Sequence, residues 1–191
     1  MEDSDAVAVA RARAGDQDAF GLLVERHSIR LFQLVYRMTG NEQGAEDVVQ
    51  ETFLRAHRQL GKFESRSNFG TWLHRIAANC SLDLLRKRRR QDQRHEPIDS
   101  IGSGDSDLLA AKSATPDQAI FNTEIHQQVE SALEQLTSME RTAFVLRHFE
   151  NCSIEEIGCA LNLGQSAAKQ AIFRAVQKVR RSLETILSST E

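Results

Sequence analysis

Both prolines of the chain, Pro97 and Pro116, fall within residues 95–117, and this placement limits the fold more than any other feature. Proline interrupts helices and central strands, so the long proline-free segments on either side are open to continuous helix formation. Residues 95–117 also contain glycine, serine and aspartate without apolar periodicity. The sequence therefore predicts two small helical domains joined by a flexible, acidic linker.

The segment before the linker carries apolar residues at three- and four-residue spacing, which is typical of amphipathic helices. One helix is predicted over residues 18–38, ended at Gly40–Asn41, and a second closes at Gly61. A third begins near Phe69, where Ser67 or Asn68 can act as the N-cap. The chain after the linker again follows a helical pattern, so we expect an all-α fold.

Length, composition and cysteine content indicate a small protein of the cytosol. The 191 residues fit one ordinary domain or two small ones, and 40% hydrophobic with 27% charged residues is a globular composition. The N-terminus lacks the apolar core of a secretory signal, and no apolar stretch has the length of a membrane span. Three cysteines without Cys-x-x-Cys spacing favour a reducing compartment. We therefore expect a cytoplasmic protein that is not itself a membrane protein.

One set of residues, His148, Cys152 and Cys159, allows a metal-site interpretation. Structural zinc sites have tighter ligand spacings than these three residues. Buried small thiols on helix faces are the expected alternative, and they also account for Cys80. The sequence therefore predicts neither a metal nor another cofactor.

Charge is partitioned along the chain, although the net charge is only −3. Residues 61–94 carry nine bases and three acids, whereas residues 95–117 carry one base and five acids. Residues 162–183 carry five bases and no acid. Two basic surfaces separated by an acidic segment are suited to binding nucleic-acid phosphates.

The most specific local pattern lies in residues 153–172. Ser153 and Glu156 form a capping box that fixes a helix start, and Asn162 stands at a sharp turn, where its tolerance of left-handed geometry is needed. Gly158 permits close approach of the helix behind it. This order predicts a helix-turn-helix. Its second helix exposes side chains suited to phosphates and base edges: Gln165, Ser166, Lys169, Gln170, Phe173 and Arg174. The alternative is the solvated face of an ordinary helical hairpin.

Aromatic and basic residues alternate between Lys62 and Arg94. A polar loop beside a basic helix is an arrangement that holds an extruded base while cations hold its backbone. The alternative assigns Trp72 and its aromatic neighbours to a hydrophobic core and the run Arg86–Arg90 to a solvated helix end.

Two parts of the chain resemble the sigma-70 family of RNA polymerase sigma factors, in its extracytoplasmic-function (ECF) group. The similarity to region 2 of that group lies in residues 45–56, AEDVVQETFLRA, and in Phe63 with residues 69–79, FGTWLHRIAAN. The similarity to region 4 lies in residues 136–147, LTSMERTAFVLR, and in the helix-turn-helix that follows them. The likeness covers roughly residues 16–94 and 118–184.

The resemblance implies that each part of the chain has the role of one region of a bacterial sigma factor. Residues 1–94 would form region 2, residues 95–117 a linker threading the polymerase near the RNA exit path, and residues 118–191 region 4. The segment docking on the large polymerase subunits would include Asp47, Gln50, Glu51, Phe53, Leu54 and Arg55. The reader of the −10 promoter element would include Phe63, Ser65, Asn68, Trp72, Arg75, Arg86, Lys87 and Arg88.

The resemblance further assigns the second helix of the helix-turn-helix, Gln165 to Arg174, to the −35 element. Its implied partners are core RNA polymerase, promoter DNA and an anti-sigma factor, with no catalytic residue and no small-molecule substrate. The family often opens this helix with Gly-Thr-Val-Lys-Ser-Arg, whereas residues 166–171 read SAAKQA. Lys169 is kept, but Ala171 replaces a base and Ala167 removes a hydroxyl. The preferred −35 sequence therefore does not follow from the resemblance.

Two other functions are alternatives to a sigma factor. A free-standing helix-turn-helix regulator would bind duplex DNA tightly as a dimer, but it gives the surface at Asp47–Arg55 no purpose. A metal-dependent nuclease would need clustered carboxylates, a nucleophile–base pair or a phosphate-binding glycine loop, and the sequence offers none of these.

Overall fold

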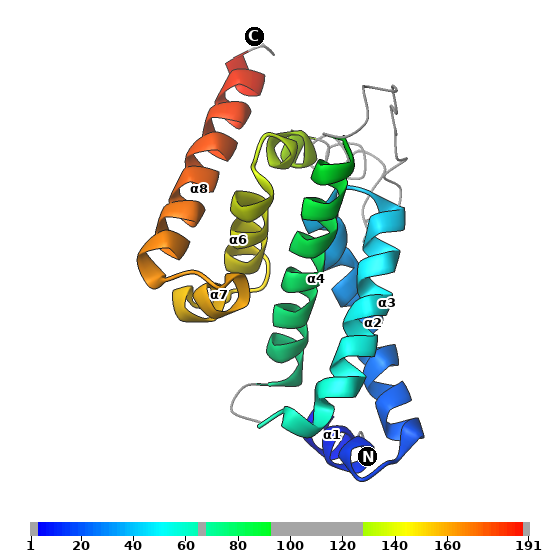
Figure 1. The fold of residues 1–191 in the computed structure, drawn as a ribbon. Helices are drawn as coiled ribbons and strands as arrows, with labels where there is room; N and C mark the ends of the chain where they lie inside the picture. The colour runs from blue at the N-terminus through cyan, green and yellow to red at the C-terminus, as the bar shows by residue number, and fades with distance from the viewer. Residues whose placement is uncertain (1–3, 65–67, 93–127, 189–191) are drawn as a thin grey trace, which may run out of the picture.

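The computed structural model describes residues 4–64, 68–92 and 128–188, and within these ranges the chain contains helices and no strand (Figure 1). The helices before the predicted linker are α1 (Asp5–Arg13), α2 (Gln17–Thr39), α3 (Glu42–Gln59), the short 3₁₀ helix η1 (Leu60–Lys62) and α4 (Phe69–Asp92). After it come helical residues 128–134, α6 (Ser138–His148), α7 (Ile154–Leu161) and α8 (Gln165–Ser188). The all-α prediction is confirmed. The predicted linker, 95–117, lies outside the described residues.

Local capping explains where the first helices begin and end. The Asp16 carboxylate accepts a hydrogen bond from the Ala19 amide at 3.1 Å and starts α2, and Gly40 ends it with a left-handed φ of 75°. Asn41 then caps α3 by accepting from the Gly44 amide at 2.8 Å. The predicted end of this helix at Gly40–Asn41 is therefore confirmed. The helix α1 was not predicted.

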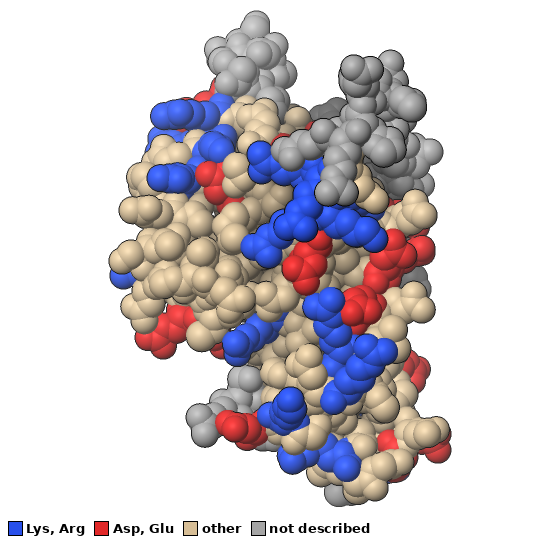
Figure 2. All heavy atoms as spheres, in the orientation of Figure 1, with Lys and Arg blue, Asp and Glu red and all other residues tan. Residues whose placement is uncertain are grey.

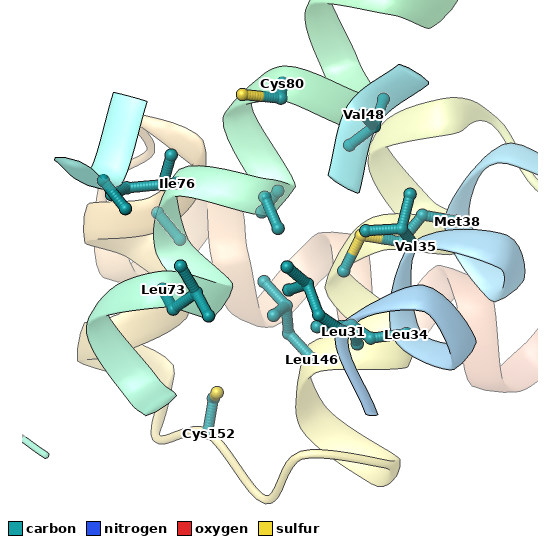
Figure 3. Close-up of a cluster of buried hydrophobic side chains, with 14 of the residues drawn as sticks. Leu31, Leu34, Val35, Met38, Val48, Leu73, Ile76, Cys80, Leu146 and Cys152 are labelled. Atoms are coloured by element: carbon teal, nitrogen blue, oxygen red, sulfur yellow. The ribbon is translucent and has the colours of Figure 1, made fainter. Parts of the chain in front are cut away.

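The helices α1 to α4 bury one apolar face each against a common core. Figure 1 shows α2, α3 and α4 side by side, with α1 crossing their lower end. Leu23, Leu34 and Met38 of α2 and Leu73 of α4 are among the largest fully buried side chains. Leu34, Met38 and Leu73 lie in the cluster of Figure 3. No helix in the described residues is both long and apolar enough to cross a membrane.

The second group of helices shares this core and does not stand apart from it. Leu146 of α6 and Cys152 of the α6–α7 turn lie in the same buried cluster as Leu31 and Leu73 (Figure 3). Ile157 of α7 belongs to this cluster as well. Accordingly, α6 packs on α2 and α4, and α7 packs on α4. The two helical groups expected from the sequence therefore meet along an apolar surface, here called the seam.

Polar contacts border the seam. One Glu150 carboxylate oxygen lies 2.9 Å from an Arg30 guanidinium nitrogen and 3.2 Å from His74 Nδ1. Arg141 Nε donates a hydrogen bond to the Arg37 carbonyl at 2.5 Å, and the Arg37 guanidinium lies 4.5 Å from the centroid of the Phe149 ring. Because a carboxylate only accepts, His74 must carry its proton on Nδ1 in this arrangement.

Burial of His74 makes the stability of the fold depend on pH. Burial lowers the pKa of His74, the Glu150 carboxylate opposes this, and Arg30 and His27 lower it further, so the net pKa lies below its ordinary value. The unfolded chain then binds a proton near pH 6.5 that the folded chain resists. We expect the contribution of His74 to the free energy of unfolding to be constant above about pH 7.5 and to fall below about pH 6.5, by up to about 1.4 kcal/mol per pH unit.

Urea denaturation of the wild type and of His74→Gln between pH 5 and 8 measures this contribution. His148→Gln is the matched control. Partial burial and Arg147 also lower the pKa of His148, but most of this side chain is exposed and it lies outside the Glu150 contact. The His74 variant should lose more of the pH dependence than the control. Equal slopes in the wild type and His74→Gln would contradict the assignment.

Candidate nucleic-acid interface

The helix-turn-helix is formed by α7, a left-handed turn and α8. Ser153 and Glu156 make the predicted capping box: the Ser153 hydroxyl accepts from the Glu156 amide at 3.2 Å, and the Glu156 carboxylate accepts from the Ser153 amide at 2.7 Å. Asn162 has φ 52° and ψ 44°, the predicted left-handed conformation. Both local predictions are confirmed.

Gly158 is needed for a different contact from the one predicted. A Cβ at this position would lie 2.9 Å from the Leu163 carbonyl oxygen, so the close approach is to the turn and not to a helix behind α7. The Leu163 amide also donates to the Gly158 carbonyl at 2.8 Å. The turn thus folds back over Gly158, which fixes the direction in which α8 leaves. On the inner side of α8, Ala168 is fully buried.

The outer face of α8 is open to solvent. All six predicted contact residues are exposed: Gln165, Ser166, Lys169, Gln170, Phe173 and Arg174. Phe173 leaves 65% of its surface exposed, which is unusual for a large apolar residue. Figure 1 shows α8 at the edge of the molecule, with α6 and α7 between it and α4. Among the described elements, this is a helix face that a DNA groove can reach.

Glu155 was not predicted to take part in this face, but it contacts the recognition helix. Its carboxylate accepts a hydrogen bond from the side-chain nitrogen Nε2 of Gln165 at 2.9 Å. Since a carboxylate cannot donate, this contact fixes the orientation of the Gln165 amide. The pair spans the turn between α7 and α8, and no periodicity of the sequence points to it.

Acids from elsewhere neutralise part of the basic run that the sequence showed in residues 162–183. Lys178 lies 2.6 Å from Glu140 of α6, and Arg180 lies 2.8 Å from Glu184. Partial burial raises the pKa of Glu140, but hydrogen bonds from Lys178 and Thr137 outweigh it and hold that pKa below its ordinary value. Two of the five bases of this run therefore meet acids, and both lie in the second half of α8.

The predicted −10 reader is built on a cluster of three aromatic rings. Phe63 packs against Phe69 and Trp72, with ring centroids 6.1 and 5.0 Å away. Phe63 is buried with 6% of its surface exposed, whereas Trp72 is half-buried. Asn68 accepts a hydrogen bond from the Thr71 amide at 2.7 Å and so takes the predicted position before α4. Ser65 lies outside the described residues.

Basic side chains gather over the C-terminal end of α4 (Figure 2). Arg86 and Lys87 are exposed there, and Arg86 lies 3.7 Å from Asp83 of its own helix. Arg88 is half-buried, because its guanidinium donates to the Asn41 side chain at 3.1 Å. Arg75 is exposed two turns after the start of the helix. The structure thus places four of the predicted −10 residues along α4 as cations able to meet phosphates.

The outer face of α3 carries the predicted polymerase-binding residues. Asp47, Gln50 and Leu54 are exposed, the last with 46% of its surface. Glu51 and Arg55 form an ion pair at 2.6 Å that lies on the same helix. The remaining predicted member, Phe53, faces the core, with 8% exposed.

The cysteines show no sign of a metal site. No group of three His, Cys, Asp or Glu residues in the described ranges is arranged to hold a metal ion, and His148, Cys152 and Cys159 all lie in those ranges. Cys80 and Cys152 are buried, as expected, but Cys159 is exposed. Burial raises the pKa of Cys152 to about 11, so this thiol is unreactive near neutral pH.

Comparison with known proteins gives a consistent result. Residues 23–91 match the profile of Sigma-70 region 2, and residues 126–179 match that of Sigma-70, region 4. The chain is 31% identical over 183 residues to the ECF RNA polymerase sigma factor SigW of Bacillus subtilis, covering 93% of this chain and 96% of SigW. It is 37% identical over 173 residues to the RNA polymerase sigma factor CarQ of Myxococcus xanthus, covering 91% and 94% of the two chains.

A solved structure with a similar fold is that of CnrH in complex with the cytosolic domain of CnrY. The similarity has a TM-score of 0.65 and 30% sequence identity. It covers 96% of this chain and 99% of the other. The likeness therefore extends over both helical groups.

The contact at Gly158 generates a test of the turn. Gly158→Ala should lower the free energy of unfolding by about 1–3 kcal/mol, because the new methyl group meets a backbone oxygen that cannot move independently. Gly21→Ala in α2 is the matched control, since a Cβ there meets nothing within 4 Å. The control should gain about 0.5–1 kcal/mol from helix propensity. Chemical denaturation compares the two, and a gain at both positions would contradict the geometry.

Proposed function

The chain belongs to the sigma-70 family of RNA polymerase sigma factors, in its ECF group, and from this we propose that it directs core polymerase to promoters with −10 and −35 elements. One observation carries the proposal: an exposed helix-turn-helix reader and a basic, aromatic region 2 occur together on one chain. A transcription initiation factor of this kind binds and positions, and the polymerase supplies the chemistry. We assign no catalytic residue.

The −35 element would be read by the outer face of α8. Lys169 and Arg174 are placed to meet phosphates, while Gln165 and Gln170 offer amide groups to base edges in the major groove. The exposed Phe173 ring is suited to contact with a thymine methyl group. These roles follow from exposure and side-chain chemistry.

The −10 element would be captured at the start of α4 and held along it. An unstacked base needs a flat surface and hydrogen-bond donors, and Trp72 and Asn68 lie at the same end of the helix. Phe63, being buried, would support this surface and not stack on the base. Arg75 and the basic end at Arg86–Arg88 would follow the backbone of the melted strand. Holding a base outside the duplex favours melting.

Core polymerase would dock on α3, through Asp47, Gln50, Leu54 and the Glu51–Arg55 pair. Phe53 would hold the helix in place from the core side. We place region 2 in residues 1–94 and region 4 in residues 118–191, with residues 95–117 as the linker through the polymerase. An anti-sigma factor, as the ECF group implies, would be a further protein partner.

Two double variants separate the functions of the two regions. Lys169→Ala with Arg174→Ala should reduce promoter transcription about tenfold or more and lower the salt slope of −35 DNA binding by about 2, with core binding unchanged. Asp47→Ala with Gln50→Ala should weaken core binding and leave DNA contacts intact. Run-off transcription and fluorescence titration with core polymerase provide the measurements.

The control pair is Arg11→Ala with Arg26→Ala, which removes the same charge from exposed positions of α1 and α2, outside both surfaces. Failure of the wild-type chain to bind core polymerase would overturn the proposal. Tight duplex binding by a dimer without polymerase would favour the free-standing regulator instead.

A further inference from the structure

The contact between Glu155 and Gln165 is a feature of the helix-turn-helix to which the proposed function gives no role. Glu155 lies in the first turn of α7, and Gln165 is the first residue of α8. Their side chains meet across the turn, where the Glu155 carboxylate accepts a hydrogen bond from Nε2 of Gln165 at 2.9 Å. Both residues are exposed, so the contact lies on the surface that DNA can reach.

Gln165 stands where a recognition helix meets the bases. The N-terminal residues of such a helix contact base edges in the major groove, and the helix before it crosses the backbone. Lys169 and Phe173 follow Gln165 at four-residue spacing, which places all three on one side of α8, and all three are exposed. Gln165 therefore has the place of a base-reading residue, and Glu155 approaches it from the helix that faces the backbone.

The Glu155 carboxylate fixes which group of the Gln165 amide is left for DNA. A glutamine amide has a carbonyl acceptor and an NH2 group with two donors, and a freely rotating amide can present either one. Because a carboxylate only accepts, it holds the NH2 group of Gln165 on the side of α7. The carbonyl oxygen Oε1 and one N–H of Gln165 then remain for a further partner.

An amide held in this orientation matches one base best. In the major groove adenine presents its N6 amino donor beside its N7 acceptor, and a glutamine carbonyl and N–H pair with these two groups together. Guanine presents two acceptors, N7 and O6, which would face the carbonyl oxygen of Gln165. Cytosine offers a donor alone, and thymine offers an acceptor and a methyl group. The oriented amide therefore favours adenine and disfavours guanine.

An acid on a DNA-binding surface lowers affinity, because a carboxylate repels the phosphates. The hydrogen bond to Gln165 supplies a compensating gain in discrimination. A hydrogen bond to a charged group is stronger than a neutral one, and it strengthens further when docking excludes water. A side chain already held in its bound orientation cannot turn to suit the wrong base, which then leaves polar groups unpaired. Glu155 is thus suited to selecting a base.

We infer that Gln165 reads an adenine of the −35 element and that Glu155 is the positioning residue that orients its amide. The inference rests on the proposed function and adds to it a base preference at one position of the element. Ala167 and Ala171, in the same part of α8, have no polar side-chain group for a base. The pair at the start of the helix therefore supplies sequence readout that these two alanines cannot.

Selection from a pool of duplexes with a randomised central segment measures this preference. The full chain is incubated with the pool, and the bound fraction is sequenced. The wild type should enrich adenine over guanine at one position by about tenfold or more, which is the discrimination of a good bidentate pair. Gln165→Ala should remove the preference at that position and leave the preferences at the other positions unchanged.

Two substitutions of Glu155 separate positioning from a merely structural role. Glu155→Ala should lower the adenine preference about threefold or more, yet tighten binding to the unselected pool, because a negative charge leaves the DNA surface. Glu155→Lys should shift the preference toward guanine, because an ammonium group donates to Oε1 and turns the NH2 group of Gln165 toward N7 and O6. A structural role alone would weaken binding to every sequence.

Glu184→Ala is the matched control. Glu184 is also an exposed glutamate with a partner 2.8 Å away, Arg180, but the pair lies toward the other end of α8. Its removal changes the net charge of the chain by the same amount and should leave the adenine preference unchanged.

The outcomes separate this inference from the proposed function. If the wild type enriches a sequence and Gln165→Ala changes no adenine preference in it, the reading by Gln165 is wrong and the proposed function stands. A position that depends on Gln165 but prefers guanine or cytosine overturns the inference equally. Unchanged preferences in both Glu155 variants overturn the positioning role. Enrichment of no sequence by the wild type also overturns the inference, and core binding by the same sample then decides the proposed function.

Discussion

The arrangement of this sigma factor depends on one continuous apolar core. Buried side chains of α2 and α4 meet those of α6 and α7 without an intervening polar layer, and Leu146 is fully buried among them. A helical group of this size alone buries little apolar surface relative to what it exposes. Sharing a core increases the buried fraction for both groups. It also sets the orientation of α8, because α8 packs mainly on α6 and α7.

Features with a local cause could be predicted from the sequence. The capping box at Ser153, the left-handed Asn162 and the stop at Gly40 each depend on residues within one turn of the helix end, so the printed sequence contains the whole interaction. The exposed face of α8 follows in the same way from the helical spacing of Gln165, Lys169 and Phe173. The motifs that resemble regions 2 and 4 supplied the assignment of the surfaces, which periodicity alone did not.

Features with partners distant in the chain could not be predicted. Lys178 counted as part of an acid-free window, yet Glu140 neutralises it from 38 residues away. Phe63 read as a base-capturing aromatic residue, yet its neighbours Phe69 and Trp72 bury it. No motif or periodicity of the sequence pointed to Glu150. In each case the decisive neighbour comes from another helix, and hydrophobic periodicity specifies which face of a helix is buried but not which helix covers it.

The polar border of the seam contributes more to the register of the two groups than to their stability. A carboxylate buried against one exposed arginine and one histidine adds little net stability, because the desolvation of a charge opposes its attraction to a partner. Removing one partner would leave the other charge buried and uncompensated, so the contact disfavours any packing that separates them. Apolar burial therefore holds the two groups together, and these few polar side chains select how they fit.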